Sequence, residues 1–492
     1  MKLKELLAGV EVLGLHADEN LQITGIAYDS RKVQPGDLFV AVTGFAADGN
    51  RFIPMAMEKG AVAVVTAKAP TGNVPFVQVK SDRLALAQIG ANFYHKPAES
   101  MQVIGVTGTN GKTSTTLLLK HVLETVLGAK VGLIGTMENL IGDEVIPAER
   151  TTPESLDLQA LFARMRDAGC THVIMEVSSH AIALDRVGGL NYAVAAFTNL
   201  TEDHLDFHKT MAEYASVKAK IFSRCQKAVI NTDDSWADYM RSQAACPVLT
   251  TSQKAPAGLY ATDACLLSDG VSFTAVYGSQ KAKVSLPIPG KFTVYNALGV
   301  LGIALQLGID LSSAAAALAT AKGVKGRVEV VPTPGKPYTV LIDYAHTPDA
   351  LENILRSVKR FCKGRVIAVF GCGGDRDPIK RPIMGRIGVD NADFVVFTSD
   401  NPRTEDPHAI LREILAGAEG TKTPYHVEEN RREAIRWAMD HAEKDDIIVL
   451  AGKGHETYQT IGKTNYHLDE REEVAAHLQE MEAQKQIGRA HV

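Results

Sequence analysis

The stretch GVTGTNGKT, residues 105–113, gives the strongest indication of fold in this chain. It joins the apolar run Val103–Val106 to the helical run Ser114–Leu127. Glycines let backbone N–H groups point at phosphate oxygens, a lysine here reaches the β and γ phosphates, and the next hydroxyl can bind magnesium. The start of the helix adds partial positive charge. The stretch therefore predicts a phosphate loop made of Gly108, Thr109, Asn110, Gly111, Lys112 and Thr113.

The loop departs from the general G-x-x-x-x-G-K-[ST] spacing in one position. Val106 stands where the first glycine is expected, and a glycine lies one residue earlier at Gly105. A chance glycine turn before a helix is the alternative. The coincidence of strand, glycine loop, Lys-Thr pair and helix favours the phosphate loop.

Strand-like and helical runs alternate on both sides of this loop. Such alternation predicts mostly parallel sheets covered by helices. We predict an α/β fold of three domains: a smaller N-terminal α/β domain (1–98), a central P-loop-type domain with a mostly parallel sheet (99–325), and a C-terminal Rossmann-like doubly wound domain (326–492). Their expected strands are Ile23–Tyr28, Leu38–Val42, Ala61–Val65 and Phe76–Val79; Val103–Val106, Val131–Ile134, His172–Val177, Tyr192–Thr198 and Ala228–Asn231; and Val340–Asp343, Val366–Phe370, Phe394–Thr398 and Ile447–Leu450.

Length and charge agree with this division. At roughly 150 residues per domain, 492 residues make about three domains. A net charge of −5 provides no global positive field for nucleic acid or an anionic membrane. Six cysteines without C-x-x-C spacing indicate free thiols in a reducing cytosol. We expect a soluble cytoplasmic protein that begins with a helix and not a signal peptide, with an unstructured tail after Gln484.

Acidic and histidine residues after two central strands suggest a metal site. Glu176 closes an apolar strand, where an inward acid is unusual, although a solvated strand end is the alternative. His204 and His208 lie one helical turn apart, as in a zinc pair, but a third ligand at matching spacing is missing. We therefore favour magnesium bound by Thr113, Glu176 and His204, with His208 structural or solvated.

A lysine lies among aromatic residues in YASVKAKIF, residues 214–222. Read as a helix, this segment places Tyr214, Lys218 and Phe222 on one face. A lysine in this setting often extends its ammonium to solvent. Burial would instead favour a neutral amine.

All four strands of the last domain run into polar or glycine-rich segments: DYAH, GCGGDRD, SDNPR and AGKGHE. Ligands bind at the carboxyl ends of strands in open α/β sheets, so these segments predict a site at one edge. GCGGDRD is not a dinucleotide fingerprint, because Arg376 occupies its last glycine position. A turn before a helix is the structural alternative for DNPR, and a capped helix start for DYAHTPDAL.

The T-G-T-N-G-K-T variant of the loop resembles the ATP loop of Mur ligases and folylpolyglutamate synthases. Further segments along the whole chain are similar to Mur ligases of the MurE type, which add the third residue of the peptidoglycan stem peptide. The resemblance implies an ATP-dependent ligase that joins meso-2,6-diaminopimelate to UDP-N-acetylmuramoyl-L-alanyl-D-glutamate through an acyl phosphate. It also implies catalytic roles for Lys112, Glu176, His204 and Lys218.

The same resemblance assigns substrate contacts to residues of the first two domains. AYDSRKVQPGDLFVA and GFAADGNRFIPMA look like uridine-nucleotide segments, and RTTPES and SSHAIALDR like segments that hold the muramoyl peptide. The residues so implicated are Ser30, Asp48, Thr151, Thr152, Ser178 and Arg186. GKFTVYNALGV, GRVE and DYAH similarly implicate Asn296, Arg327, Asp343 and the loop of His346 in ATP binding, whereas Thr293 replaces a family asparagine.

DNPR, residues 400–403, marks family members that take diaminopimelate, whereas lysine-adding relatives lack this arginine. Asp400 suits an ammonium, and Arg403 suits the second carboxylate of diaminopimelate because its guanidinium binds bidentately. The residues implicated are Arg376, Asp400, Asn401, Pro402, Arg403, Gly452 and Glu456.

The pattern Y-x-x-A-K-x-x-L-F of Mur ligases resembles residues 214–222, with Val217 and Ile221 replacing Ala and Leu. It implies that Lys218 becomes N6-carboxylysine, a carbamate that helps bind the second of two magnesium ions. The expected partners are small molecules, and we expect a monomer without nucleic acid or membrane insertion. Rival interpretations are a lysine-adding ligase, a folylpolyglutamate synthase, a P-loop ATPase switch and a noncatalytic sugar-nucleotide sensor.

Overall fold

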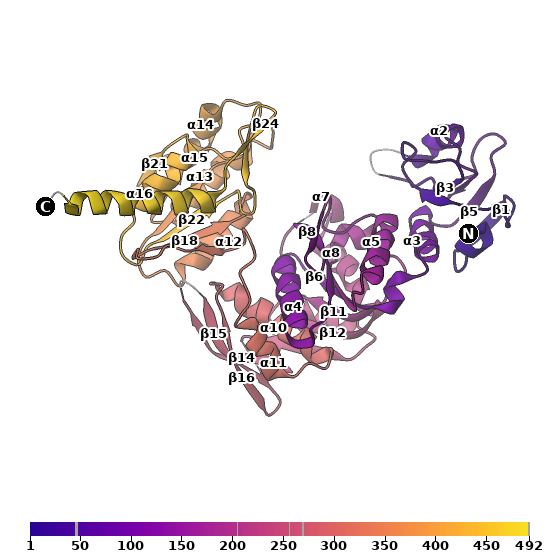
Figure 1. Ribbon diagram of the computed structural model, residues 1–492, viewed down its shortest axis with the longest axis horizontal. Helices are drawn as coiled ribbons and strands as arrows, with labels where there is room; N and C mark the ends of the chain where they lie inside the picture. The colour runs from indigo at the N-terminus through magenta and orange to yellow at the C-terminus, as the bar shows by residue number, and fades with distance from the viewer. Residues whose placement is uncertain (45–47, 204, 255, 268–269, 491–492) are drawn as a thin grey trace. The chain divides into compact units, whose positions relative to one another are not determined.

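The computed structural model describes residues 1–44, 48–203, 205–254, 256–267 and 270–490 (Figure 1). They form two compact units. The first contains Met1–Tyr260, Val276–Lys281 and Tyr295–Ala317, and the second contains Ala261–Ala275, Ala282–Val294 and Leu318–Val492. Within the described residues, every helix is too short or too polar to cross a membrane.

The N-terminal sheet has five strands in the order β1-β5-β4-β3-β2. β1 is antiparallel to β5, and the other pairs are parallel. Ser81 caps the long helix of this region, because its hydroxyl accepts a hydrogen bond from the Leu84 amide at 3.2 Å. The elements are α1 (Leu3–Leu6), β1 (Val12–His16), β2 (Gly25–Ala27), β3 (Asp37–Val40), η1 (Gly49–Phe52), α2 (Ile53–Glu58), β4 (Ala63–Thr66), β5 (Phe76–Val79), α3 (Asp82–Phe93) and η2 (Pro97–Ser100).

The central sheet confirms the predicted parallel core. β6 (Gln102–Thr107) pairs in parallel with both β10 (His172–Glu176) and β11 (Tyr192–Phe197), so the phosphate loop starts at the middle of the sheet. Parallel strands β7 (Val131–Ile134), β12 (Cys225–Asn231) and β13 (Val248–Ser252) extend it. The helices are α4 (Lys112–Leu127), α5 (Ser155–Asp167), α6 (Ser179–Ala183), α7 (Leu205–His208), α8 (Met211–Ala219), η3 (Lys220–Arg224), α9 (Ala237–Ser242), α10 (Lys291–Gln306) and α11 (Leu311–Leu318).

Strands at the edges of this sheet were not among the predicted ones. β8 (Glu138–Ile141) and β9 (Glu144–Pro147) form an antiparallel hairpin beside β7. β14 (Leu259–Leu266), β15 (Val271–Tyr277) and β16 (Gln280–Leu286) lie beyond β13. β9 and β14 are largely exposed, and β16 alternates buried and exposed residues, so these strands lack the apolar runs that identify the central strands.

The C-terminal sheet has the order β17-β18-β22-β19-β20-β21 and is parallel from β18 to β21. This confirms the predicted doubly wound pattern. The strands are β17 (Glu329–Val331), β18 (Thr339–Asp343), β19 (Val366–Phe370), β20 (Phe394–Phe397), β21 (Tyr425–Val427) and β22 (Ile447–Ala451), followed by the hairpin β23 (Tyr458–Ile461) and β24 (Thr464–His467). The helices are α12 (Pro348–Lys359), α13 (Lys380–Asn391), α14 (Pro407–Ala418), α15 (Arg431–Asp440) and α16 (Glu470–Ala490).

Two details of the sequence interpretation are corrected. α16 continues to Ala490, so the predicted unstructured tail after Gln484 is wrong. The predicted helix over residues 214–222 is α-helical only to Ala219, after which it tightens into the 3₁₀ turn η3. Last turns of α-helices often tighten in this way.

Helices α13 and α14 pack through two glycines. A Cβ atom at Gly417 would lie 1.9 Å from the Pro382 carbonyl oxygen, and one at Gly385 would lie 2.1 Å from the Ile414 carbonyl oxygen. Because both neighbours are backbone atoms, a side chain would push the helices apart.

We expect Gly417→Ala to lower the free energy of unfolding by about 1–3 kcal/mol, the usual effect of overpacking. Denaturant unfolding of the full chain measures this change. Gly323→Ala is the control, because its Cβ would meet its nearest atom at 3.8 Å. Equal stability of the Gly417 variant and the parent chain would contradict the expectation.

Candidate active site

The phosphate loop has a backbone that requires glycine. Gly108 has φ +149°, and a Cβ there would lie 1.9 Å from the Thr198 hydroxyl oxygen. Gly111 has φ +84° and directly precedes α4. The loop can therefore curl tightly between β6 and α4 and present backbone amides at the start of the helix.

The loop after β11 stabilises the phosphate loop by hydrogen bonds, and it was not predicted from the sequence. Asn199 follows β11 and makes three hydrogen bonds: its carbonyl accepts from the Thr109 amide at 2.8 Å, and its side chain accepts from the Asn110 amide at 2.9 Å and donates to the Asn110 carbonyl at 3.0 Å. Thr198 donates to the same carbonyl at 2.7 Å. The available signal was a polar Thr-Asn pair directly after an apolar strand.

Lys112 folds back over the phosphate loop. Its ammonium donates to the carbonyl oxygens of Gly108 at 3.0 Å and Thr109 at 2.8 Å. The Lys112 ammonium therefore lies at the phosphate loop, and its side chain can rotate toward a bound phosphate.

Glu176 is the buried acid at the end of β10. Its carboxylate accepts hydrogen bonds from the Thr113 hydroxyl at 3.0 Å and from the amide and hydroxyl of Thr136, both at 3.0 Å. Thr136 was not predicted, because it follows a strand without a recognised motif. The carboxylate and two hydroxyls are hard oxygen donors and fit the chemistry of magnesium.

Nitrogen or sulfur ligands do not join this group in the described part of the chain. The structure shows no cluster there of three or more His, Cys, Asp or Glu side chains that could hold a metal ion. The predicted ligand His204 lies outside the described residues. The other histidine, His208, is buried, with Nε2 2.8 Å from the Ser179 hydroxyl and its ring stacked on Tyr214. His208 thus has the structural role that we predicted as one of two options.

Lys218 is buried beside the phosphate loop. Its Nζ lies 4.7 Å from the centre of the Tyr214 ring and donates to the Gly108 carbonyl at 2.9 Å. Burial, and then the charge of Lys112, lower the pKa of Lys218 well below its ordinary value, while Asp203 opposes this shift. The alternative of an ammonium extended to solvent is excluded, because the side chain is 1% exposed.

The residues assigned to the muramoyl peptide gather around the backbone of Glu176. The Thr152 hydroxyl donates to the Glu176 carbonyl at 2.8 Å and accepts from the Ser178 amide at 3.2 Å. Arg186 donates to the Thr152 carbonyl at 3.3 Å and pairs with Glu154 at 3.0 Å. Burial lowers the pKa of Arg186 despite that carboxylate. Thr151 joins the group because its hydroxyl oxygen lies 3.1 Å from the Thr136 hydroxyl oxygen, within hydrogen-bond distance.

Ser30 and Asp48 lie in the N-terminal domain, and the hydrogen bonds described for them stay there. The Ser30 hydroxyl donates to the Met55 sulfur at 3.4 Å, and Asp48 caps η1 by accepting from the Asn50 amide at 3.0 Å. Hydrogen bonds from Asn50 lower the pKa of Asp48. A cavity of about 330 Å³ is lined by Tyr28 and Lys32 of the N-terminal region and by residues of the central region, including Arg150 and Glu154.

The residues assigned to ATP fall in both units. In the first, the Asn296 side-chain oxygen lies 2.5 Å from the position that a Cβ of Gly111 would take. In the second, Asp343 ends β18 and accepts from the amides of Val328 and Ala345, each at 2.9 Å. Burial raises the pKa of Asp343, opposed by Arg327, whose guanidinium lies 5.4 Å from the centre of the Tyr344 ring.

His346 is exposed, and its Nδ1 lies 2.8 Å from the Tyr344 carbonyl oxygen. The hydroxyl of Thr347 caps α12, so the capped helix start considered for DYAHTPDAL is present.

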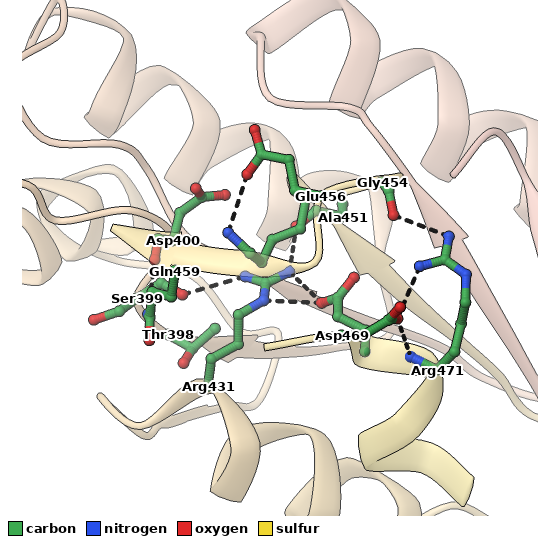
Figure 2. Close-up of polar contacts among 12 residues, drawn as sticks. Thr398, Ser399, Asp400, Arg431, Ala451, Gly454, Glu456, Gln459, Asp469 and Arg471 are labelled. Atoms are coloured by element: carbon green, nitrogen blue, oxygen red, sulfur yellow. Dashed lines mark hydrogen bonds and ion pairs between the residues drawn. The ribbon is translucent and has the colours of Figure 1, made fainter. Parts of the chain in front are cut away.

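The polar segments after the C-terminal strands meet at one edge, as predicted. A Cβ at Gly452, after β22, would lie 2.5 Å from a carboxylate oxygen of Asp400, after β20. Asn401 donates to Glu456 at 3.0 Å and accepts from Lys453 at 3.0 Å. Figure 2 includes Asp400 and Glu456. Lys453 is fully buried and was not predicted, although its position in AGKGHE between two assigned residues was a signal.

The two arginines at this edge are held by backbone carbonyls. Arg403 has φ +51° and donates to the Gly374 carbonyl at 2.8 Å, and Arg376 donates to the Asp375 carbonyl at 3.0 Å. The carbonyl of Pro402 lies 1.9 Å from the position that a Cβ of Gly374 would take. Hydrogen bonds from Thr404 lower the pKa of the Asp375 carboxyl, and both guanidiniums lie near enough to lower it further. A guanidinium can bind a carboxylate ligand bidentately.

Comparisons with known proteins cover nearly the whole chain. Three family models match: "Mur ligase family, catalytic domain" over residues 22–94, "Mur ligase middle domain" over 106–304, and "Mur ligase, glutamate ligase domain" over 326–454. Proteins named UDP-N-acetylmuramoyl-L-alanyl-D-glutamate--2,6-diaminopimelate ligase from Caldanaerobacter subterraneus subsp. tengcongensis and Clostridium tetani are 49% and 45% identical to this chain. Each match covers 98% of this chain and 100% of the relative.

Solved structures agree with this result. A structure with the same enzyme name is 32% identical, has a TM-score of 0.75 and covers 98% of this chain and 99% of its own. A folylpolyglutamate synthase of Mycobacterium tuberculosis, complexed with ADP and AMPPCP, is 20% identical with a TM-score of 0.60, and covers 75% of this chain and 92% of its own. The latter shares the fold. From the family models and the full-length identities, the chain belongs to the Mur ligase family.

Proposed function

We propose that this chain is the ATP-dependent ligase that joins meso-2,6-diaminopimelate to UDP-N-acetylmuramoyl-L-alanyl-D-glutamate in peptidoglycan precursor synthesis. The observation that carries the proposal is 49% identity over 98% of the chain to a relative with that name. The site supports it, because a phosphate loop lies beside a buried acid in one unit, and in the other the DNPR loop contacts Glu456 through Asn401.

The proposed reaction has two steps. The glutamyl side-chain carboxylate attacks the γ-phosphorus of ATP, and ADP leaves as an acyl phosphate forms. The amine of diaminopimelate then attacks the acyl carbon, an amide bond forms, and inorganic phosphate leaves with loss of a proton. Lys112 and the amides of Gly108–Thr113 bind and orient the phosphates, which spread negative charge in the transition state.

Magnesium fits the oxygen donors of the first unit. We assign Thr113, Glu176, His204 and Lys218, the last as its carbamate, to two ions. Bound magnesium would neutralise charge between the two anionic reactants. The support for the carbamate is the burial and lowered pKa of Lys218, because only a neutral amine adds carbon dioxide.

The remaining residues divide between three small molecules. The muramoyl dipeptide nucleotide is assigned to Ser30, Asp48, Thr151, Thr152, Ser178 and Arg186, with the cavity near Tyr28 and Arg150 between the segments that carry them. Adenine and ribose are assigned to Asn296, Arg327 and Asp343. Diaminopimelate is assigned to Arg376, Asp400, Asn401, Pro402, Arg403, Gly452 and Glu456.

We further expect a cytoplasmic monomer with three domains, 1–98, 99–325 and 326–492. Its substrates are small anionic or zwitterionic molecules. Neither nucleic acid nor a membrane is an expected partner, because a net charge of −5 offers no general attraction for phosphate backbones or anionic headgroups.

ADP release tests the proposed reaction directly. The purified chain is incubated with ATP, magnesium and the muramoyl dipeptide nucleotide, and the acceptor is varied among diaminopimelate, lysine and glutamate. We expect ADP only with both substrates, and fastest with diaminopimelate. Lysine preference would support the lysine-adding type, glutamate preference a folylpolyglutamate synthase, acceptor-independent hydrolysis a switch, and no hydrolysis a sensor.

Replacement of Lys218 tests the carbamate. Lys218→Ala should abolish turnover, with a loss of about 10³-fold or more, because a charged ligand of the reaction centre is removed. Short-chain carboxylic acids should restore part of the activity. Labelled bicarbonate should give a carbamate carbon signal by NMR in the parent chain and not in the variant.

Lys220→Ala is the matched control for this experiment, because Lys220 lies two residues away and is exposed. It should retain the parent rate and the carbamate signal. Full activity of Lys218→Ala would refute the assignment.

Arg403 should control the choice between diaminopimelate and lysine. Arg403→Ala removes the cation assigned to the second carboxylate, so the preference in kcat/KM for diaminopimelate over lysine should fall by about 10²-fold. The ratio is measured from ADP release with each amino acid. Arg412→Ala, on an exposed arginine of α14, should leave the ratio unchanged; an unchanged ratio in the Arg403 variant would contradict the assignment.

A further inference from the structure

A fully buried ion pair lies behind the diaminopimelate loops. Arg431 is the first residue of α15 and Glu470 the first of α16, and both side chains are 0% exposed. Their closest nitrogen and oxygen atoms are 2.7 Å apart. Neither residue is among those assigned to a substrate.

The guanidinium also joins two strands that do not touch. β20 and β22 are separated in the sheet by β19, so their backbones cannot hydrogen bond to each other. Arg431 donates to the Ser399 carbonyl after β20 at 3.3 Å and to the Ala451 carbonyl at the end of β22 at 2.9 Å. These carbonyls directly precede Asp400 and Gly452. One side chain thus fixes the distance between two loops of the amino-acid site.

The two loops that follow the Ser399 and Ala451 carbonyls are closely packed. A Cβ on Gly452 would lie 2.5 Å from the Asp400 carboxylate, so the two loops are already at closest approach. The first turn of α16 adds a second support, since Arg471 donates to the Gly454 carbonyl at 3.0 Å and pairs with Asp469 at 3.0 Å (Figure 2). A small shift of α16 would therefore displace the segment that carries Glu456.

Stability alone does not explain the pair. Two charges removed from water lose hydration, and apolar residues of similar volume often replace a buried ion pair without loss of stability. Oε2 of Glu470 is buried and has no hydrogen-bond partner among the described residues, which adds to the cost. An apolar pair could fill the same space, but it could not donate to two carbonyls at once.

We propose that Arg431, neutralised by Glu470, is a positioning residue that sets the affinity of the site for diaminopimelate. This inference rests on the proposed function. Arg431 acts through the backbone of Ser399 and Ala451 and does not touch substrate. Its planar fork is required, because a lysine ammonium is a point donor that cannot span the two carbonyls in the same way.

Steady-state kinetics of two variants test this role. Arg431→Lys keeps the charge and removes the fork, whereas Arg431→Met combined with Glu470→Leu replaces the pair by apolar side chains. In both, we expect the KM for diaminopimelate to rise about tenfold or more, because small misplacements of binding groups are costly. The KM values for ATP and the muramoyl dipeptide nucleotide should stay within about twofold, and kcat within about threefold, since the phosphate loop is untouched.

Arg365→Met is the matched control. Arg365 pairs with buried Asp446 at 2.7 Å, and these residues directly precede β19 and β22 at the opposite edge of the same sheet. Its variant should melt at a lower temperature, because Asp446 loses its partner, while the KM for diaminopimelate stays at the parent value.

Three results would overturn the proposal: an unchanged KM for diaminopimelate in both Arg431 variants, an equal rise in all three KM values, or an equal rise in Arg365→Met. The parent chain separates this inference from the function on which it rests. Absence of diaminopimelate-dependent ADP release in the parent would refute the proposed function and this role together, whereas an active parent with unaffected variants would refute only the role of Arg431.

Discussion

Two lysine side chains converge on one backbone carbonyl, and the chemistry of the first unit depends on this crowding. Lys112 and Lys218 both donate to the Gly108 oxygen, at 3.0 and 2.9 Å. Burial of Lys218 lowers its pKa, and the neighbouring charge of Lys112 lowers it further. The loop thus lies against two lysines, of which Lys218 loses its proton more readily than an ordinary lysine. A bound nucleotide and a carbamate would both relieve the excess positive charge.

The tight approach of strand ends makes this crowding possible. Gly108 can sit against Thr198 only because it lacks a side chain, and Asn199 then fixes the loop by three hydrogen bonds. On the other side of β6, Glu176 receives the hydroxyl of Thr113 at the start of α4. The end of β6 is therefore flanked by the neutral amide of Asn199 on one side and by the carboxylate of Glu176 on the other. Carboxylate oxygens are the ligands that magnesium would need beside a phosphate.

The sequence predicted the alternation of strands and helices better than it predicted individual edge strands and contacts. Apolar runs identified most of the parallel strands, because strands buried on both faces have few polar residues. The parallel strands β13 and β21 were missed, since β13 ends in Thr-Thr-Ser and β21 is largely exposed. β9 and the hairpin of β23 and β24 were missed because they are largely exposed, and β8 because Glu138 and Asn139 interrupt its apolar run. Asn199, Thr136 and Lys453 were not named from the sequence, because their contacts arise from strands that meet only in the folded chain. His204 stays a prediction, since it lies outside the described residues.

In each unit, a buried basic side chain donates hydrogen bonds to backbone carbonyls. The two side chains differ in the charged groups around them. Lys218 donates to a carbonyl and its pKa is lowered, which shows that nearby anions do not compensate its charge fully. Arg431 also donates to carbonyls, but Glu470 neutralises it at 2.7 Å. A neutralised guanidinium has little attraction for an anionic ligand, and its remaining donors can only hold backbone. The compensated pair is therefore suited to keeping two loops at a fixed distance, whereas Lys218 is suited to losing its proton.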